Sequence, residues 1–164
     1  MGLTPFQTVG PFLHLGLRAG LEPMTALGLT EPIVIHGRLL DGGGDGIGDG
    51  VLEFWAAGFD AVGRVWTEPD GRYRLVSVMP ATRVDADAVV HAPHFSVRVL
   101  ARGILTEYLT RVYFDGEPDN QRDPILCSVP AARRATLLAL PGGANEYHFD
   151  IVVQGERETV FFDL

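Results

Sequence analysis

The chain has 164 residues, enough for one domain with a hydrophobic core of its own. Its formal net charge of −8 argues against nucleic acid as a partner, because phosphate binding needs a basic face. With one cysteine, Cys127, no disulfide can form within the chain, and no apolar run approaches the roughly 18 residues of a membrane span. No signal-like leader opens the sequence. We therefore expect a cytoplasmic protein that neither binds nucleic acid nor crosses a membrane.

The chain is expected to begin with an arm and to continue as a β domain. Residues 1–32 are rich in Pro, Gly and Thr and alternate little, which indicates an extended arm. Residues 33–40 and 51–55 predict two strands. The segment between them, 41–50, is rich in Gly and Asp, so we expect the two strands to form a hairpin. Its spacing does not fit a calcium loop, and no helix follows it as in a phosphate-binding loop.

The rest of the chain predicts more strands and one helix. Strands are expected at 63–67, 72–78, 95–101, 107–114, 147–154 and 158–162. The last two are expected to pair, because only three residues separate them. Pro130 suits the first turn of a helix, and residues 131–140 are strong helix formers. About eight short strands with turns between them predict an antiparallel β-sandwich over residues 33–164, with one short helix near 130–140.

Motifs judged from pattern alone identify no catalytic centre. His91 and His94 lie close together, but a catalytic metal usually needs three protein ligands. Arg102 ends a predicted strand just before Gly103, where a guanidinium binds a carboxylate or simply faces solvent. Residues 4–12 are either a tied-down terminus or a rigid loop that presents groups to a ligand.

Four segments resemble the intradiol ring-cleavage dioxygenases, and within them the protocatechuate 3,4-dioxygenase subunits. Residues 4–17 (TPFQTVGPFLHLGL) resemble the opening of these subunits, and residues 92–103 (APHFSVRVLARG) resemble the central strand of the alpha subunit. Residues 110–114 (TRVYF) and 147–163, ending in ETVFFD, fit the same subunit. The resemblance runs over nearly the whole chain, and implies an intradiol-dioxygenase or prealbumin-like β core.

The resemblance also implies where iron is held. The beta subunits of this family bind Fe(III) through two Tyr and two His, which suits the preference of ferric iron for hard anionic ligands. They cleave protocatechuate with O2 to 3-carboxy-cis,cis-muconate. In this chain His94 matches one ligand, Ser96 replaces the second His, and residues 57–62 and 81–84 contain no Tyr. We therefore expect a chain without its own metal, in a hetero-oligomer with an iron-bearing beta subunit.

By the same resemblance, Thr8, Pro11 and Arg102 are expected to line the substrate pocket of the adjoining beta subunit, with the arm packed on that partner. The region 55–63 is shorter than in typical members, and Phe12 stands where a Tyr is common. Two alternatives remain. One is a stand-alone, transthyretin-like β-sandwich that binds without catalysis. The other is a chain that holds a different metal through His91 and His94.

Overall fold

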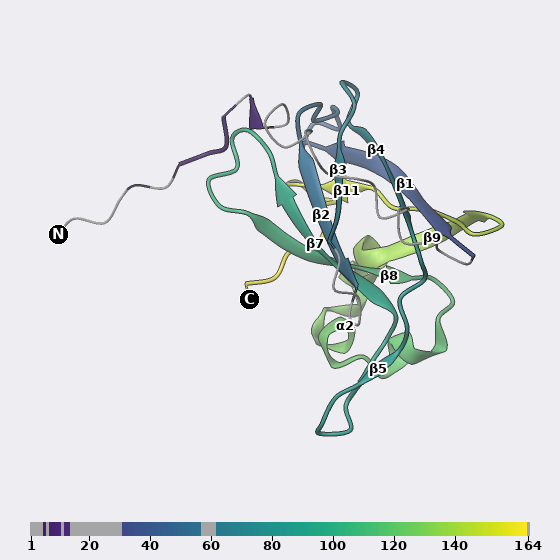
Figure 1. The fold of residues 1–164 in the computed structure, drawn as a ribbon. Helices are drawn as coiled ribbons and strands as arrows, with labels where there is room; N and C mark the ends of the chain where they lie inside the picture. Colours follow the sequence, from purple (N-terminus) through teal and green to yellow (C-terminus); the bar gives the residue numbers. More distant parts are fainter. Residues whose placement is uncertain (1–4, 6, 11, 14–30, 57–61, 164) are drawn as a thin grey trace.

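The computed structural model describes residues 5, 7–10, 12, 13, 31–56 and 62–163 (Figure 1). Its strands are β1 (Ile33–Leu40), β2 (Val51–Ala56), β3 (Val62–Trp66), β4 (Arg72–Ser77), β5 (Arg83–Val84), β6 (Val90–His91), β7 (His94–Leu100), β8 (Tyr108–Phe114), β9 (Leu138–Gly143), β10 (Glu146–His148) and β11 (Ile151–Val152). Between β8 and β9 lie the short helices η2 (Pro118–Gln121), α2 (Pro124–Ser128), α3 (Ala131–Arg134) and η3 (Ala135–Leu137). Within the described ranges, no helix is long and apolar enough to cross a membrane.

The strands form a mixed, nearly closed, barrel-like sheet, so the expected antiparallel sandwich is wrong in its finer form. The order is β11-β1-β10-β9-β8-β7-β2-β3, with β4 paired to β1. β1 runs parallel to β10 and β11, and β8 runs parallel to β9. Parallel neighbours need a crossover connection, and the helical segment 118–137 supplies one between β8 and β9. The prediction of a mostly β chain is confirmed.

The expected hairpin between β1 and β2 is also wrong. β1 pairs with β4, whereas β2 pairs with β3 and β7. The glycine-rich segment 41–50 instead folds onto the turn that joins β3 to β4. A side chain at Gly46 would collide with the carbonyl of Asp70, and one at Gly48 would crowd Pro69. The glycines therefore allow two backbones to meet at one end of the barrel.

The expected helix over 131–140 ends at Leu137. Leu138 and Ala139 pair with Tyr113 and Phe114 as the start of β9, so tertiary pairing overrides the helix propensity of this run. The helix α2 was missed, although Asp123 caps it and Pro124 takes its first position.

The C-terminal strands are shorter than expected. The predicted strand 147–154 is split into β10 and β11, and residues 158–162 form no strand. The segments 147–154 and 158–162 meet only locally, where the Thr159 N–H donates to the Val152 carbonyl (2.9 Å). The Phe162 N–H donates to the Leu109 carbonyl (2.7 Å), so the end of the chain lies beside β8.

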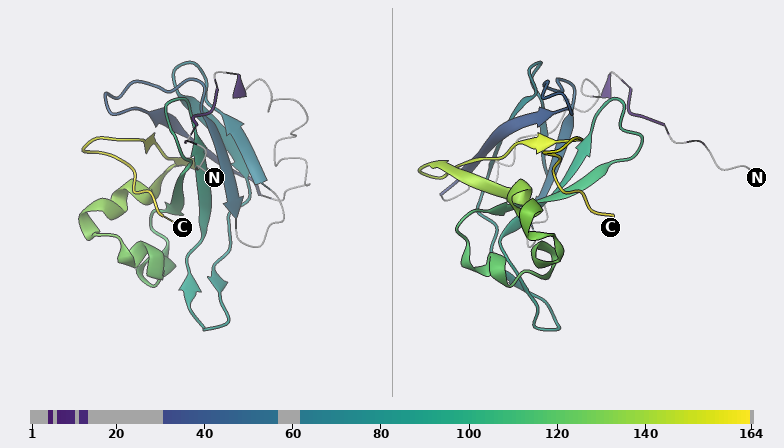
Figure 2. Two further views of the ribbon diagram at one scale, coloured as in Figure 1. Left: turned by 90° about the vertical axis from the view of Figure 1, so that its left-hand side faces the viewer. Right: turned by 180° about the vertical axis from the view of Figure 1, so that it is seen from behind.

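Two apolar clusters hold the fold together. The larger fills the barrel with inward side chains such as Ile35, Phe54, Phe95 and Val97. The smaller lies outside β8 and is made of Ala92, Tyr113, Leu126, Val129 and Leu137. It fixes the helical segment 118–137, which lies on one side of the barrel (Figure 2). Side chains that alternate along β7 and β8 therefore face either the barrel interior or this outer side.

Candidate functional site

Arg102 lies in a tight turn that follows β7. The Ile104 N–H donates to the Ala101 carbonyl (3.3 Å), and Gly103 has a φ of 84°. A positive φ at the third position is typical of a type II turn, which glycine adopts without strain. Arg102 takes the second position, and its side chain is 61% exposed. The turn therefore projects the guanidinium outward at the end of the barrel.

The N-terminal arm reaches this turn, as Figure 1 shows near the loop between β7 and β8. The Gly103 N–H donates to the Thr8 hydroxyl (2.8 Å). Residues 95 positions apart in the sequence are thereby joined beside Arg102. Two of the three expected pocket residues, Thr8 and Arg102, are thus neighbours. The third, Pro11, lies outside the described residues.

Arg102 also borders a cleft of about 600 Å³. The glycine-rich segment 41–50 forms one wall, and Tyr108, Val153 and Gln154 line another part. Asp49 from that segment forms an ion pair with the Arg102 guanidinium. No signal in the sequence pointed to this role of Asp49, because nothing distinguishes it from the two other Asp residues of the loop or indicates that it will meet an Arg 53 positions later.

A second pocket, of about 220 Å³, lies at the other end of β7, on the outer side of the sheet. Its lining includes Trp55, Arg83, His91, His94, Ser96 and Arg111. Ser96 is paired across strands with Trp55 on β2 and with Arg111 on β8. Directly opposed residues of neighbouring strands lie about 5 Å apart, so these side chains converge. We call this the His94 pocket; it contains His94 and Ser96, which the resemblance compares with the two His ligands of iron, whereas residues 57–61 lie outside the described residues.

The His94 ring is fixed in one tautomer. Its Nδ1 lies 2.7 Å from the Ala92 carbonyl, which can only accept, so Nδ1 carries the proton and Nε2 is the acceptor. The side chain is only 8% exposed. Burial, the largest effect, lowers the pKa of His94; the bond to Ala92 works against this, and the charge of Arg111 adds to the lowering. His94 is therefore a neutral ring near pH 7.

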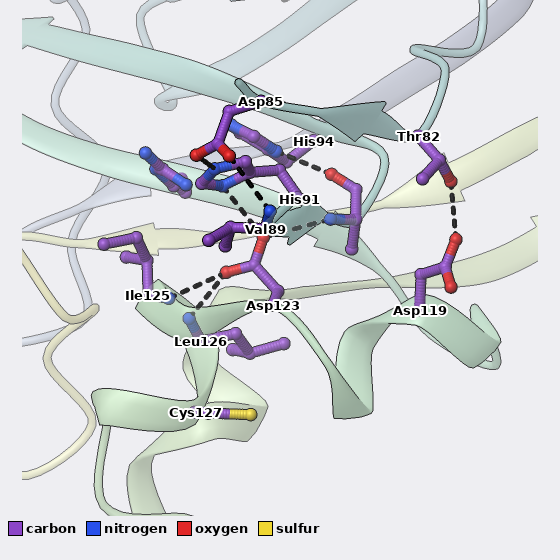
Figure 3. Close-up of polar contacts among 12 residues, drawn as sticks. Thr82, Asp85, Val89, His91, His94, Asp119, Asp123, Ile125, Leu126 and Cys127 are labelled. Carbon is purple, nitrogen blue, oxygen red and sulfur yellow. Dashed lines mark hydrogen bonds and ion pairs between the residues drawn. The ribbon is translucent and has the colours of Figure 1, made fainter. Parts of the chain in front are cut away.

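Asp123 organises the wall beside this pocket (Figure 3). Its buried carboxylate accepts hydrogen bonds from the backbone N–H groups of Ala92, Ile125 and Leu126 and from the Tyr113 hydroxyl. It therefore caps α2 and ties that helix to the strands. Burial of the Tyr113 phenol, the largest effect, raises its pKa, so the hydroxyl stays a donor.

His91 lies between two carboxylates, as Figure 3 shows. Its Nε2 is 3.4 Å from Asp85 and its Nδ1 is 3.9 Å from Asp123. Backbone N–H groups, above all that of Val89, lower the pKa of Asp85, which is therefore ionised at neutral pH. Both nitrogens of His91 are thus directed at carboxylates of this chain.

The side chains of the His94 pocket do not suit ferric iron. His94 offers one nitrogen, and Ser96 adds a neutral hydroxyl where the family resemblance places a second His. Arg83 and Arg111 place positive charge in the same pocket, which opposes a bound cation. Among the described residues, no group of three or more His, Cys, Asp or Glu is arranged to hold a metal ion.

Comparison with known proteins decides the family. The chain is 39% identical to the protocatechuate 3,4-dioxygenase alpha chain of Burkholderia cepacia, over 98% of this chain and 97% of that protein. It is 37% identical to the alpha chain of Pseudomonas putida, over 98% and 96%. The chain belongs to the family of protocatechuate 3,4-dioxygenase alpha chains. This confirms the resemblance seen in the sequence. A comparison with models of protein families found no match.

A protocatechuate 3,4-dioxygenase beta chain is a more distant relative of this chain. That of Burkholderia cepacia is 28% identical, over 93% of this chain and 76% of the beta chain. Solved structures agree on the fold. The hydroxyquinol 1,2-dioxygenase of Pseudomonas putida DLL-E4 superimposes with a TM-score of 0.63 at 18% identity, over 80% of this chain and 58% of that one. A dioxygenase domain from Streptomyces sp. SirexAA-E gives 0.61 at 24% identity, over 93% and 98%.

These relatives favour a dioxygenase subunit over a stand-alone, transthyretin-like binding module. The curated proteins that match are dioxygenase chains along nearly their whole length. The structural neighbours are intradiol dioxygenases with the same β core. Both findings concern the whole domain, whereas the roles of Thr8, Pro11 and Arg102 stay predictions.

Proposed function

We propose that this chain is the subunit without iron of a protocatechuate 3,4-dioxygenase and works only together with a beta chain that carries Fe(III). The complex would cleave protocatechuate with O2 between its two hydroxyl-bearing carbons to give 3-carboxy-cis,cis-muconate. The family assignment supports the activity, and the poor fit of the His94 pocket to ferric iron supports the division of labour.

In this proposal the chain supplies binding groups and leaves the redox chemistry to its partner. Arg102 would place a positive charge near the carboxylate of the substrate, and a guanidinium can bind a carboxylate through two parallel hydrogen bonds. Thr8 would fix the arm beside Arg102 through its bond to Gly103. Pro11 would add a rigid apolar surface to the same pocket. The observation that carries this role is the joining of the arm to the Arg102 turn at the open end of the barrel.

The arm, residues 1–32, would pack on the beta chain. Its Phe12 is 73% exposed, and Leu105 in the neighbouring loop is also largely exposed. Burying such side chains on a partner is favourable by about 25 cal/mol per Å² of apolar surface. We also propose that the complex works in the cytoplasm. The chain has one free cysteine and forms no internal disulfide, so it needs no oxidising compartment.

The proposal is tested by expressing the chain alone and together with a beta chain. Iron content, oxygen uptake with protocatechuate and formation of the muconate are measured for each preparation. The complex should contain iron and turn over, and the chain alone should do neither. Stoichiometric iron in the chain alone, or no turnover by a stable complex, would overturn the proposal.

A further inference from the structure

The His94 pocket contains two arginines that form no ion pair with a carboxylate of the described residues. Arg83 comes from β5 and Arg111 from β8. Carboxylates pair with five other described arginines, namely Arg64, Arg72, Arg98, Arg102 and Arg122. Several more have no such partner, but only Arg83 and Arg111 share this pocket. Neither Arg83 nor Arg111 has such a partner within the same part of the chain. In a protein of net charge −8, two such arginines in one pocket indicate a place for an anion.

Arg111 is the more buried of the two arginines. Its Nη1 donates to the Tyr113 hydroxyl (3.2 Å). Its Nε is buried and has no hydrogen-bond partner among the described residues. A buried donor without a partner costs free energy, and native structures rarely leave one without a ligand, water or ion nearby. The unpaired Arg111 Nε is therefore a second observation that points to a ligand, and it is independent of the missing ion pairs.

The two nearby carboxylates form no ion pair with Arg83 or Arg111. Asp123 uses its oxygens to cap α2 and to accept from Ala92 and Tyr113. Asp85 accepts from the backbone of its own loop, and both carboxylates face His91. Asp85 is thus bonded to the β5–β6 hairpin and Asp123 to the helix α2. The two guanidinium groups of Arg83 and Arg111 remain available to a ligand in the pocket.

The volume and the lining of the pocket limit which anions could bind in it. Its volume, about 220 Å³, is below the range of roughly 300–1,000 Å³ of pockets for drug-sized ligands. The Trp55 indole forms an apolar wall beside the Ser96 hydroxyl. We propose that the His94 pocket binds a small carboxylate with a flat apolar body, its carboxylate held by Arg83 and Arg111 and its body against Trp55. This site is separate from the Arg102 cleft and does not depend on the proposed catalytic role.

Benzoate is a suitable probe, because it has the charge and the flat ring but lacks the two hydroxyl groups of a catechol. Calorimetric titration of the assembled complex should reveal a benzoate site in this chain that Arg83→Ala and Arg111→Ala each weaken at least tenfold. Benzamide, which is uncharged, and acetate, which lacks the ring, should each bind at least tenfold more weakly. Arg74→Ala, which removes an exposed arginine on β4 outside both pockets, serves as the control and should leave benzoate binding unchanged.

The location is checked by crystals of the complex soaked with 4-iodobenzoate, whose iodine gives an anomalous peak. A peak beside Trp55 and Arg83 is expected. Arg83 is exposed on a short strand, so its variant should fold normally, with an unchanged melting temperature. The proposal is wrong if no peak lies in this pocket, if Arg83→Ala binds benzoate as the parent does, or if inorganic phosphate binds there and benzoate does not.

Discussion

The two ends of β7 carry arginines in opposite circumstances. At the arm end, Arg102 is exposed, paired with Asp49 and adjacent to an open cleft. At the other end, about 20 Å away along the six steps from Leu100 to His94, Arg83 and Arg111 share a small pocket without carboxylate partners among the described residues. In Figure 1, β5 lies at the bottom of the molecule, and the described arm residues 7–10 lie near the top beside the loop between β7 and β8.

This difference separates an exposed arginine at one end of β7 from a pocket that is held within the fold at the other end. An exposed arginine in a turn is free to serve a neighbouring subunit, because little of its own fold depends on it. The His94 pocket is tied into the fold by Asp123 and by the cross-strand neighbours of Ser96, and its lining does not suit ferric iron. Each variant below is expected to affect one end of β7 and to leave the other end unchanged.

The largest effect is expected from Arg102→Ala in the assembled complex. Loss of a hydrogen bond to a charged group costs about 1.5–3 kcal/mol, so kcat/KM for protocatechuate should fall about 10- to 100-fold. Iron content should not change. Arg74→Ala, which removes an exposed arginine on β4, is the matched control and should retain full activity. Full activity in Arg102→Ala would remove this residue from the substrate site.

Asp123→Asn should lower the free energy of unfolding by about 1–3 kcal/mol, as expected when a buried hydrogen-bonding group loses its match. The amide nitrogen that replaces one oxygen cannot accept, so the donor of Ala92 or those of α2 would be left unpaired. Denaturant unfolding of the complex measures the change. Asp87→Asn, on the exposed tip of the β5–β6 hairpin, should be neutral, and equal losses in both variants would contradict the role given to Asp123.

Thr8→Val should have a smaller effect and only at the arm end. Valine keeps the shape but cannot accept from the Gly103 N–H, and one such bond is worth about 0.5–1.5 kcal/mol. Turnover should fall a few-fold, with benzoate binding at the His94 pocket unchanged. Thr8→Ser keeps the hydroxyl and should restore most of the activity; no rescue would argue against this hydrogen bond.

The smallest effect is a pH dependence at the other end of β7. The pKa of His94 is lowered in the folded protein, so the unfolded chain takes up this proton first as pH falls below about 6.5. Stability from neutral His94 is therefore present above that pH and declines below it. His94→Gln should flatten the decline of unfolding free energy between about pH 6.5 and 5. An unchanged slope would show that His94 does not titrate in this way.

Much of this protein is determined locally by its sequence. The β-rich composition, the Gly103 turn and the segments that resemble the dioxygenase subunits can all be recognised without a structure. Each depends on neighbours in the chain: alternation for strands, a positive φ for glycine, and short motifs for the family. The expectation that Ser96 stands where the family has a second His concerns one position, so it could be made from the sequence alone.

Only the tertiary structure decided which distant residues meet. The segment 138–143 is a strand because Tyr113 and Phe114 pair with its first residues, although its first three residues, Leu138–Leu140, favour a helix when taken alone. Asp49 forms an ion pair with Arg102, and Arg83 lines the same pocket as Arg111. Local propensity encodes neither of these meetings. Strand order and side-chain convergence depend on the burial of the whole barrel. The sequence therefore identified the kind of subunit, and the tertiary structure determined which charges lie at each end of β7.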